Sequence, residues 1–487
     1  MLEPTRYNIN MSPGVWTEIA GAFTLIASVL ATAHVILTKK NARASFAWVG
    51  IVWLVPVIGP VLYLLFGINR IKRKAQILRS GLDELFPFHI TESRSSQCAI
   101  EPQTSQLKRL CRMTERISGL PLLPGNRITP LEDGDNAYQA MLRVIDEAER
   151  SISLSTYIFD NDRVGEMFLS ALARARERGV AIRVLVDDMG ARYSFPSIVK
   201  SLKKSGIEAA TFLPTLIPSR VPFVNLRNHR KILIVDGKTG FTGGMNIREG
   251  HLLRLNPPSP VRDIHFLVEG PVVKQMQQVF VEDWYFSTGE MLEGDLWFRK
   301  IPSSGDVLAR GIPDGPDEDY EKHLHTILSA LTMARKTVVI VTPYFLPEDN
   351  IITAINLAAL RGVKIDIILP EKNNIPLIKW ASHNILEQII GENCNLWVSK
   401  PPFDHSKIMV VDGEWALIGS GNWDARSFRL NFEFNLECYH SGFANGLLRI
   451  VKGKIENARK ITVDELKGRS ILTKLRDGAS FMLSPYL

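Results

Sequence analysis

The chain has 487 residues, which gives room for two or three domains with ample cores. Its formal net charge of +7 favours an anionic partner, although nucleic acid and acidic lipid satisfy that charge equally well. The cysteines are scattered without a Cys-x-x-Cys pair, which argues against a zinc site or a disulfide framework.

Near the N-terminus, residues 19–37 are predominantly apolar and long enough to cross a hydrocarbon core of about 30 Å as a helix. A second apolar run covers residues 47–66, and its Pro56, Gly59 and Pro60 favour either a kinked spanning helix or a re-entrant hairpin. We expect two spans in a membrane segment of residues 1–75. A cleaved signal peptide fits poorly, because no basic cluster precedes the first run and the second follows at once.

The basic residues around these runs predict their orientation. Lys39, Lys40 and Arg43 lie between the runs, whereas six cations lie on the other side: Arg6, Arg70, Lys72, Arg73, Lys74 and Arg79. The positive-inside rule therefore places the catalytic body on the cytoplasmic side, although the connecting loop is itself basic. The cluster from Arg70 to Arg79 is also suited to acidic headgroups, at about 1 kcal/mol per charge.

Residues 76–125 read as a polar, pattern-poor connector, and two related halves follow at residues 126–305 and 306–487. Each half contains a strand, an amphipathic helix and a second strand, at residues 151–159, 164–178 and 179–187 and again at 337–345, 349–360 and 362–369. This pattern predicts an α/β fold whose largely parallel strands are covered by helices. Tyr157 and Tyr344 end the first strand of each half, where they could line the site, although core packing is the role that we expect for each.

The two halves also share a motif. His229, Lys231 and Asp236 recur at the same spacing as His405, Lys407 and Asp412. Each copy is followed by a glycine-rich turn that ends in an asparagine, seventeen residues after the histidine, at Asn246 and Asn422. One copy would be weak evidence, but two copies with matching turns are hard to attribute to chance.

The residue types indicate phosphodiester chemistry. A histidine, with a pKa near neutrality, can attack or move protons, while lysine and asparagine suit phosphate oxygens. On a strand, the histidine and lysine share a face that the aspartate does not. We therefore interpret Asp236 and Asp412 as structural turn anchors first and catalytic groups second. Two such sets brought face to face would enclose one phosphodiester between two histidines.

This duplicated motif resembles that of the phospholipase D superfamily. The resemblance implies two α/β/α sandwich halves that form one pseudo-two-fold active site, a phosphohistidine intermediate, and neither an obligatory metal nor a cofactor. It carries over His229, Lys231, Asp236 and Asn246 from the first half and His405, Lys407, Asp412, Ser420 and Asn422 from the second. Gly244 departs from the pattern, because it occupies the position that Ser420 has in the second copy.

The superfamily also places a carboxylate behind each histidine. We expect Asp263 to serve His229 and Glu433 to serve His405, each fixing the tautomer of its imidazole. The alternative for both carboxylates is a surface ion pair.

The resemblance narrows to bacterial cardiolipin synthases of the phospholipase D type, through the hydrophobic segments, the stretch at residues 41–48 and the stretch from Asn422 to Glu433. It implies that His229 takes a phosphatidyl group from one phosphatidylglycerol and passes it to a second, giving cardiolipin and glycerol. The implied location is the bacterial inner membrane, as a multi-pass protein whose partners are anionic phospholipid and membrane rather than nucleic acid.

Three alternatives remain open. Another phospholipase D-type phosphatidyltransferase or a lipid hydrolase would use the same residues. A membrane-tethered phosphodiesterase or nuclease is disfavoured, because no basic stripe interleaved with stacking aromatics lies near the motifs. A membrane scaffold with a fossil site is disfavoured because both motifs are intact.

Overall fold

The computed structural model describes residues 13–39, 42–67, 104–214, 226–316 and 319–484. The chain forms two compact units, residues 1–74 and 75–487, and each is described by itself. The basic cluster from Arg70 to Arg79 and residues 76–103 of the predicted connector lie outside the described residues.

The N-terminal unit is a helical hairpin. It contains α1 (Pro13–Thr38), α2 (Ala42–Leu54), α3 (Ile58–Leu62) and a π-helical turn at Tyr63–Gly67. Polar contacts join the helices, since Trp53 Nε1 donates to Thr32 Oγ1 at 3.0 Å and His34 Nδ1 lies 2.7 Å from Tyr63 Oη.

Only the first apolar run forms a helix long and apolar enough to cross a membrane, at Trp16–Thr38, among the described residues. The second run is interrupted, because α2 ends at Leu54, just before Pro56, and Val57 adopts a left-handed φ of 69°. The interruption that Pro56, Gly59 and Pro60 predict is therefore present, between α2 and α3. A second crossing of the membrane stays a prediction.

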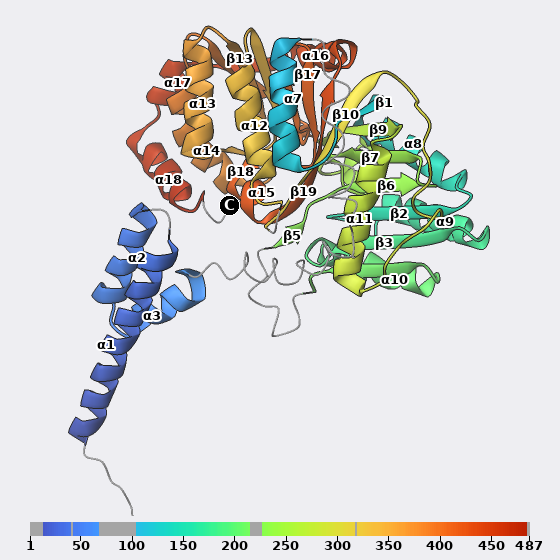
Figure 1. Cartoon of the computed structure of the whole chain (residues 1–487). Coiled ribbons are helices and arrows are strands. Elements are labelled where there is room, and N and C mark those ends of the chain that lie inside the picture. The colour runs from blue at the N-terminus through green and yellow to red at the C-terminus, as the bar shows by residue number, and fades with distance from the viewer. Residues whose placement is uncertain (1–12, 40–41, 68–103, 215–225, 317–318, 485–487) are drawn as a thin grey trace, which may run out of the picture. The chain divides into compact units, whose positions relative to one another are not determined.

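The second unit is built on one extended sheet that runs through both halves (Figure 1). The strand order is β4 (Glu208–Phe212), β3 (Ala181–Asp187), β2 (Ser151–Thr156), β6 (Ile232–Val235), β7 (Thr239–Gly243), β9 (Ile264–Glu269), β1 (Leu123–Glu132), β10 (Val307–Asp314), β19 (Asn431–Tyr439), β17 (Trp415–Gly419), β16 (Ile408–Val411), β11 (Thr337–Val341), β13 (Lys364–Pro370), β14 (Cys394–Ser399) and β20 (Ala458–Ile461). The pairing of β1 with β10 joins the halves.

The order is nearly mirrored about that junction, as the repeat in the sequence predicts. In the first half β2 pairs in parallel with β3, and α9 (Arg163–Glu177) connects them. In the second half β11 pairs in parallel with β13 through α13 (Asp349–Leu360). Each half has its own apolar core between sheet and helices. The α/β fold class is confirmed, with long antiparallel stretches between the parallel pairs.

Residues 104–125, the part of the predicted connector that the structure describes, contain regular secondary structure. They include α7 (Ser105–Ser118), which begins where Thr104 Oγ1 accepts from Leu107 N at 3.3 Å and ends at Gly119 with a φ of 73°. This helix packs on α12 (Lys322–Met333). The buried Arg310 guanidinium donates to a carbonyl of α7, at Cys111, and also pairs with Glu437. The connector interpretation is wrong for residues 105–118, which belong to the second half's core.

Candidate active site

Two short parallel bridges cross the junction between the halves and position the histidines. Strand β5 (Arg227–Asn228) pairs with the start of β19, and His229 N donates to Phe432 O at 2.8 Å. Strand β15 (Phe403–Asp404) pairs with β8 (Val261–Arg262), and His405 N donates to Arg262 O, also at 2.8 Å. Each histidine is therefore held in register with a segment of the opposite half.

The next residue on each opposing segment is a carboxylate. His229 Nδ1 lies 2.9 Å from both oxygens of Glu433, and His405 Nδ1 lies 3.0 Å from Asp263 Oδ2. The predicted assignment is thus wrong in its pairing, because it matched each histidine with the carboxylate of its own half. Both carboxylates are buried, so a surface ion pair is wrong as well. Each carboxylate lies at the junction and forms its histidine contact with the motif histidine of the other half.

The two carboxylates have unlike surroundings. Glu433 accepts hydrogen bonds from Ser420 Oγ at 2.5 Å, Ser427 Oγ at 2.8 Å and Asn431 Nδ2 at 3.2 Å. Burial alone would raise the pKa of Glu433, but His229 and these donors hold it at about 2. Burial likewise lowers the pKa of His229 to about 4, against the opposing pull of Glu433. At neutral pH this pair is an ionised carboxylate beside a neutral imidazole.

Asp263 lacks an equivalent set of hydroxyl donors. Apart from His405, it accepts from Ile264 N at 2.8 Å. Gly244 allows the close packing here, because a Cβ at that position would lie 2.6 Å from Asp263 Oδ2. Burial raises the pKa of Asp263 to about 7, although the Lys407 charge opposes that rise. The pair of Asp263 and His405 therefore keeps a proton up to a higher pH than the pair of Glu433 and His229 does.

The lysines and asparagines of the motifs surround the two histidines. Lys231 Nζ donates to His229 O at 2.7 Å, and Lys407 Nζ donates to His405 O at 2.6 Å. Burial lowers the pKa of Lys231 to about 7 and that of Lys407 to about 8. Asn422 Oδ1 is buried and has no hydrogen-bond partner within the described part of the chain. The lysine ammonium groups and the asparagine side-chain N–H groups are donors suited to a ligand's phosphate oxygens, whereas Asn422 Oδ1 would accept from a donor such as a hydroxyl.

The motif aspartates point away from the pocket and hold the starts of neighbouring strands. Asp236 Oδ1 accepts from Arg150 N at 2.7 Å and from Ser151 N at 3.1 Å, where β2 begins. Asp412 Oδ1 accepts from Thr337 N at 2.9 Å, where β11 begins. Both aspartates have a left-handed φ, 53° and 54°. These contacts support the interpretation of both aspartates as structural groups. Neither Asp236 nor Asp412 is among the residues that line the active-site pocket, so the structure gives no support for a direct catalytic role.

His229 and His405 open onto one pocket of about 710 Å³ that residues of both halves line. The Tyr157 ring meets the His229 ring edge-on at 5.2 Å between centroids, and Tyr344 meets His405 at 6.1 Å. Both tyrosines line the pocket, which was the less favoured of their two predicted roles, and Tyr344 also packs in the core of the second half as expected. Their matching positions at the ends of β2 and β11 were the signal in the sequence.

The sequence did not single out several cations of the pocket. The lining includes Arg227, Arg248, Lys372 and Arg426. Arg248 Nε lies 3.3 Å from Asp160 Oδ2 at the pocket's edge. A pocket with this many cations suits a substrate that carries negative charge.

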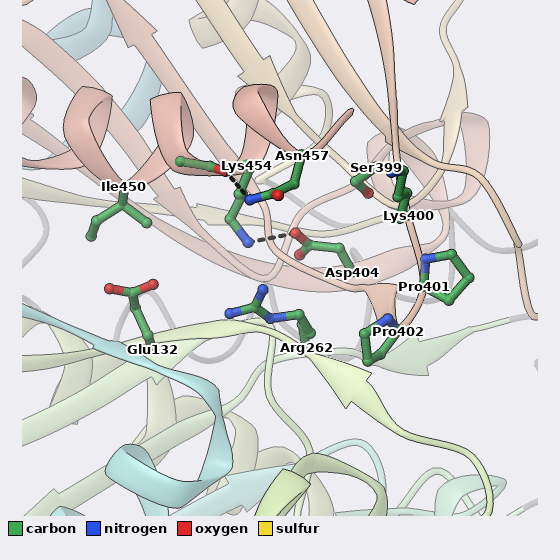
Figure 2. Close-up of a pocket in the computed structure, with 11 residues that line it drawn as sticks. Glu132, Arg262, Ser399, Lys400, Pro401, Pro402, Asp404, Ile450, Lys454 and Asn457 are labelled. Carbon is green, nitrogen blue, oxygen red and sulfur yellow. Dashed lines mark hydrogen bonds and ion pairs between the residues drawn. The ribbon is translucent and has the colours of Figure 1, made fainter. Parts of the chain in front are cut away.

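A second cavity of about 450 Å³ is lined by Asp404, and it shares Pro401 and Pro402 with the active-site pocket (Figure 2). In it, Lys454 forms a buried ion pair with Asp404, the residue before His405. From the first half, Arg262 faces the same space and pairs with Asp133 at 3.1 Å. Charged groups of both halves thus fix the backbone on either side of the His405–Asp263 pair.

Within the described ranges, no three His, Cys, Asp or Glu side chains come close enough to hold a metal ion. Independence of metals and cofactors stays a prediction.

Sequence comparison shows where this architecture recurs. A family model described as "Cardiolipin synthase, PLD-like domain" matches residues 141–284 and 327–453, and a "Phospholipase_D-nuclease N-terminal" model matches residues 26–67. The chain belongs to the cardiolipin synthase family of phospholipase D-like proteins. The two matched blocks correspond to the two halves that share the sheet.

Relatives in this family match nearly end to end. The cardiolipin synthase of Geobacillus kaustophilus is 29% identical over 98% of this chain and 96% of its own length. That of Geobacillus thermodenitrificans is 30% identical, with coverage of 96% and 95%. Among solved structures, the phosphatidylserine synthase of Haemophilus influenzae has the same fold with a TM-score of 0.60, at 14% identity, over 78% of this chain and 100% of that chain.

The role of the motif aspartates can be tested with Asp236→Ala. We expect the free energy of unfolding to fall by about 2–3 kcal/mol, because several buried backbone N–H groups lose their acceptor. The turnover number of the folded fraction should change only a few-fold. Asp412→Ala, at the equivalent but more exposed position, is the matched control, and it should lower the free energy of unfolding by a smaller amount. Denaturant titration and steady-state kinetics measure the two quantities. A loss of turnover at unchanged stability would make Asp236 a catalytic group.

Proposed function

We propose that the protein transfers a phosphatidyl group from one phosphatidylglycerol molecule to another, producing cardiolipin and glycerol. The observation that carries this proposal is the pair of histidines from opposite halves, each on a buried carboxylate and both facing one pocket. Two imidazoles on one phosphodiester can act as nucleophile and as acid. The family of the chain supports the choice of phospholipid substrate.

The different surroundings of the two carboxylates support different roles for the two histidines, one as nucleophile and one as general acid. Ionised Glu433 keeps the proton of His229 on Nδ1, which leaves the Nε2 lone pair free to attack phosphorus. The pair of His405 and Asp263 keeps a proton up to a higher pH than the other pair, and His405 can give a proton to the departing oxygen. We therefore assign His229 as nucleophile and His405 as general acid.

The reaction then proceeds in two displacements. His229 Nε2 forms a bond to phosphorus while the bond from phosphorus to the glycerol oxygen breaks, and that oxygen takes the proton of His405. The terminal hydroxyl of a second phosphatidylglycerol next gives its proton to His405 and attacks phosphorus, which releases His229. One phosphodiester replaces another, so no nucleotide is consumed.

Charge on the transferred phosphoryl group is balanced by groups of both halves. Lys231 and Lys407, with Asn246 and Asn422, would donate to its oxygens, as positioned cations do in other phosphoryl transfers. Ser420 and Ser427 act one step away, by keeping Glu433 ionised.

For location, we propose the bacterial inner membrane with the catalytic unit on the cytoplasmic side. The supporting features are the apolar helix at Trp16–Thr38 and the family of the chain. A second crossing through residues 42–67 is part of this proposal.

The proposed reaction is tested by incubating the reconstituted protein with phosphatidylglycerol vesicles and measuring lipids by mass spectrometry and free glycerol enzymatically. We expect cardiolipin and glycerol in equal amounts, without loss of activity in chelator. Phosphatidic acid as the only product would instead indicate a hydrolase, and cleavage of single-stranded DNA without lipid product would indicate a nuclease. In His405→Ala, a trapped phosphatidyl adduct should map to His229, and an adduct elsewhere would overturn the assignment.

The proton held between His405 and Asp263 predicts a pH dependence. Because burial raises the pKa of Asp263 to about 7, the acid form is present below that pH and is lost above it. We expect kcat/KM for phosphatidylglycerol to fall about tenfold per pH unit on the alkaline side. Asp263→Asn should remove this limb from the pH profile. A kcat/KM that rises through neutrality to a plateau would contradict the assignment.

A further inference from the structure

The C-terminal helix α18 (Ile471–Met482) has its apolar side facing outward. Leu472 is 76% exposed and Leu475 is 63% exposed. With Ile471, Met482 and Leu483 they form one exposed stripe, spaced as neighbours on a helix face, which we call the α18 stripe. A surface helix of a globular protein normally buries its apolar face, so we expect the α18 stripe to bind another molecule or a membrane.

The opposite face of α18 is polar and buried. Asp477 is fully buried and pairs with His383 Nδ1 at 3.0 Å and with Arg469 at 2.5 Å. These contacts attach α18 to α14 (Pro376–Ile389), which lies beside it (Figure 1). Because the polar network fixes which side faces inward, the α18 stripe is held outward rather than exposed by a loose fit.

The α18 stripe leads toward the mouth of the active-site pocket. Arg469 pairs with Glu387 near the end of α14, whereas the Arg476 guanidinium lies 4.6 Å from the Trp380 ring, nearer its start. The two helices therefore run antiparallel, and the Met482 end of α18 lies toward the first turn of α14. That first turn follows Ile375, which lines the pocket.

The mouth itself carries exposed apolar side chains from both halves. Ile375 and Leu377, at the start of α14, are each 38% exposed. From the first half, Tyr193 lines the pocket, and Phe195, two residues further on, is fully exposed. Apolar side chains of both halves thus lie at or next to the opening, and the Met482 end of the α18 stripe lies toward those at the start of α14.

The charges around the stripe suit an anionic surface. Of the four cations between Lys467 and Leu483, Arg469 pairs with Glu387 and Asp477, and Arg476 pairs with Asp477. The positive charge beside the stripe therefore comes from Lys467 and Lys474. Amphipathic helices with cations beside exposed leucines bind membrane interfaces, with the apolar side at the acyl boundary.

We propose that the α18 stripe and the apolar rim of the pocket dock the catalytic unit onto an anionic lipid bilayer, so that the mouth opens at headgroup level. This inference rests on the proposed lipid substrate, whose phosphodiester lies at that level. A bilayer is favoured over a protein partner because exposed apolar side chains of both halves flank the opening through which a lipid would enter.

The docking is measured with the full chain and an environment-sensitive fluorophore on Leu472→Cys. Cys98→Ser is included, because the other three cysteines are buried. After reconstitution into phosphatidylglycerol-containing vesicles, we expect blue-shifted emission and quenching by nitroxides on the lipid acyl chains. Leu360→Cys is the matched control, since Leu360 is 83% exposed. It lies before the N-terminal end of β13, whereas the chain reaches the pocket after the C-terminal end of that strand. The emission of that probe should be typical of an aqueous environment and should not be quenched by the lipid nitroxides.

A second measurement uses Leu472→Ser/Leu475→Ser, with Leu360→Ser as its control. The rate on vesicles relative to that on monomeric short-chain phosphatidylglycerol should fall about fivefold in the double variant, because less apolar area enters the interface. The control should keep the wild-type ratio, and circular dichroism confirms folding.

The inference is overturned if the Leu472 probe reports water, or if its emission is blue-shifted without quenching by lipid nitroxides, which would mean that protein covers the stripe. An unchanged rate ratio in the double variant would overturn it as well. The fluorescence needs no turnover. Lipid quenching without any cardiolipin formation would therefore refute the proposed function and leave the docking surface intact.

Discussion

Two short parallel bridges across the junction of the halves determine the chemistry of this protein. Each places a histidine of one half directly opposite the carboxylate of the other, so neither half contains a complete catalytic pair. The extended sheet, the joining of β1 with β10 and the buried ion pair of Lys454 with Asp404 all serve to keep these bridges in register. An error of one residue in either bridge would separate imidazole from carboxylate.

A duplicated scaffold would be expected to give two equivalent histidines, but the groups around their two carboxylates differ between the copies. Ser420 supplies a hydroxyl to Glu433, whereas Gly244, at the equivalent position, supplies none to Asp263. Hydroxyl donors keep one carboxylate ionised, and their absence lets burial raise the pKa of the other. The same fold thereby offers a nucleophile on one side of the phosphodiester and an acid on the other.

The sequence revealed what depends on local patterns. The repeat predicted the strand-helix-strand units, and the expected helix at residues 349–360 matches α13. The paired motifs identified both histidines and both lysines. The partner of each carboxylate could not be predicted, because pairing across the junction depends on register between segments far apart in the chain. The apolar stripe of α18 was equally hidden, since a periodic apolar pattern reads as a core-facing helix whichever side faces outward.

The crossed pairing is the central claim, and a donor with 4-nitrophenol in place of glycerol tests it most directly. This leaving group needs no proton, so the first displacement then depends on the nucleophile's pair alone. Asp263→Asn and His405→Ala should each release about one equivalent of 4-nitrophenolate in a burst, whereas Glu433→Gln and His229→Ala should show none. A burst in Glu433→Gln that is absent from Asp263→Asn would contradict the account.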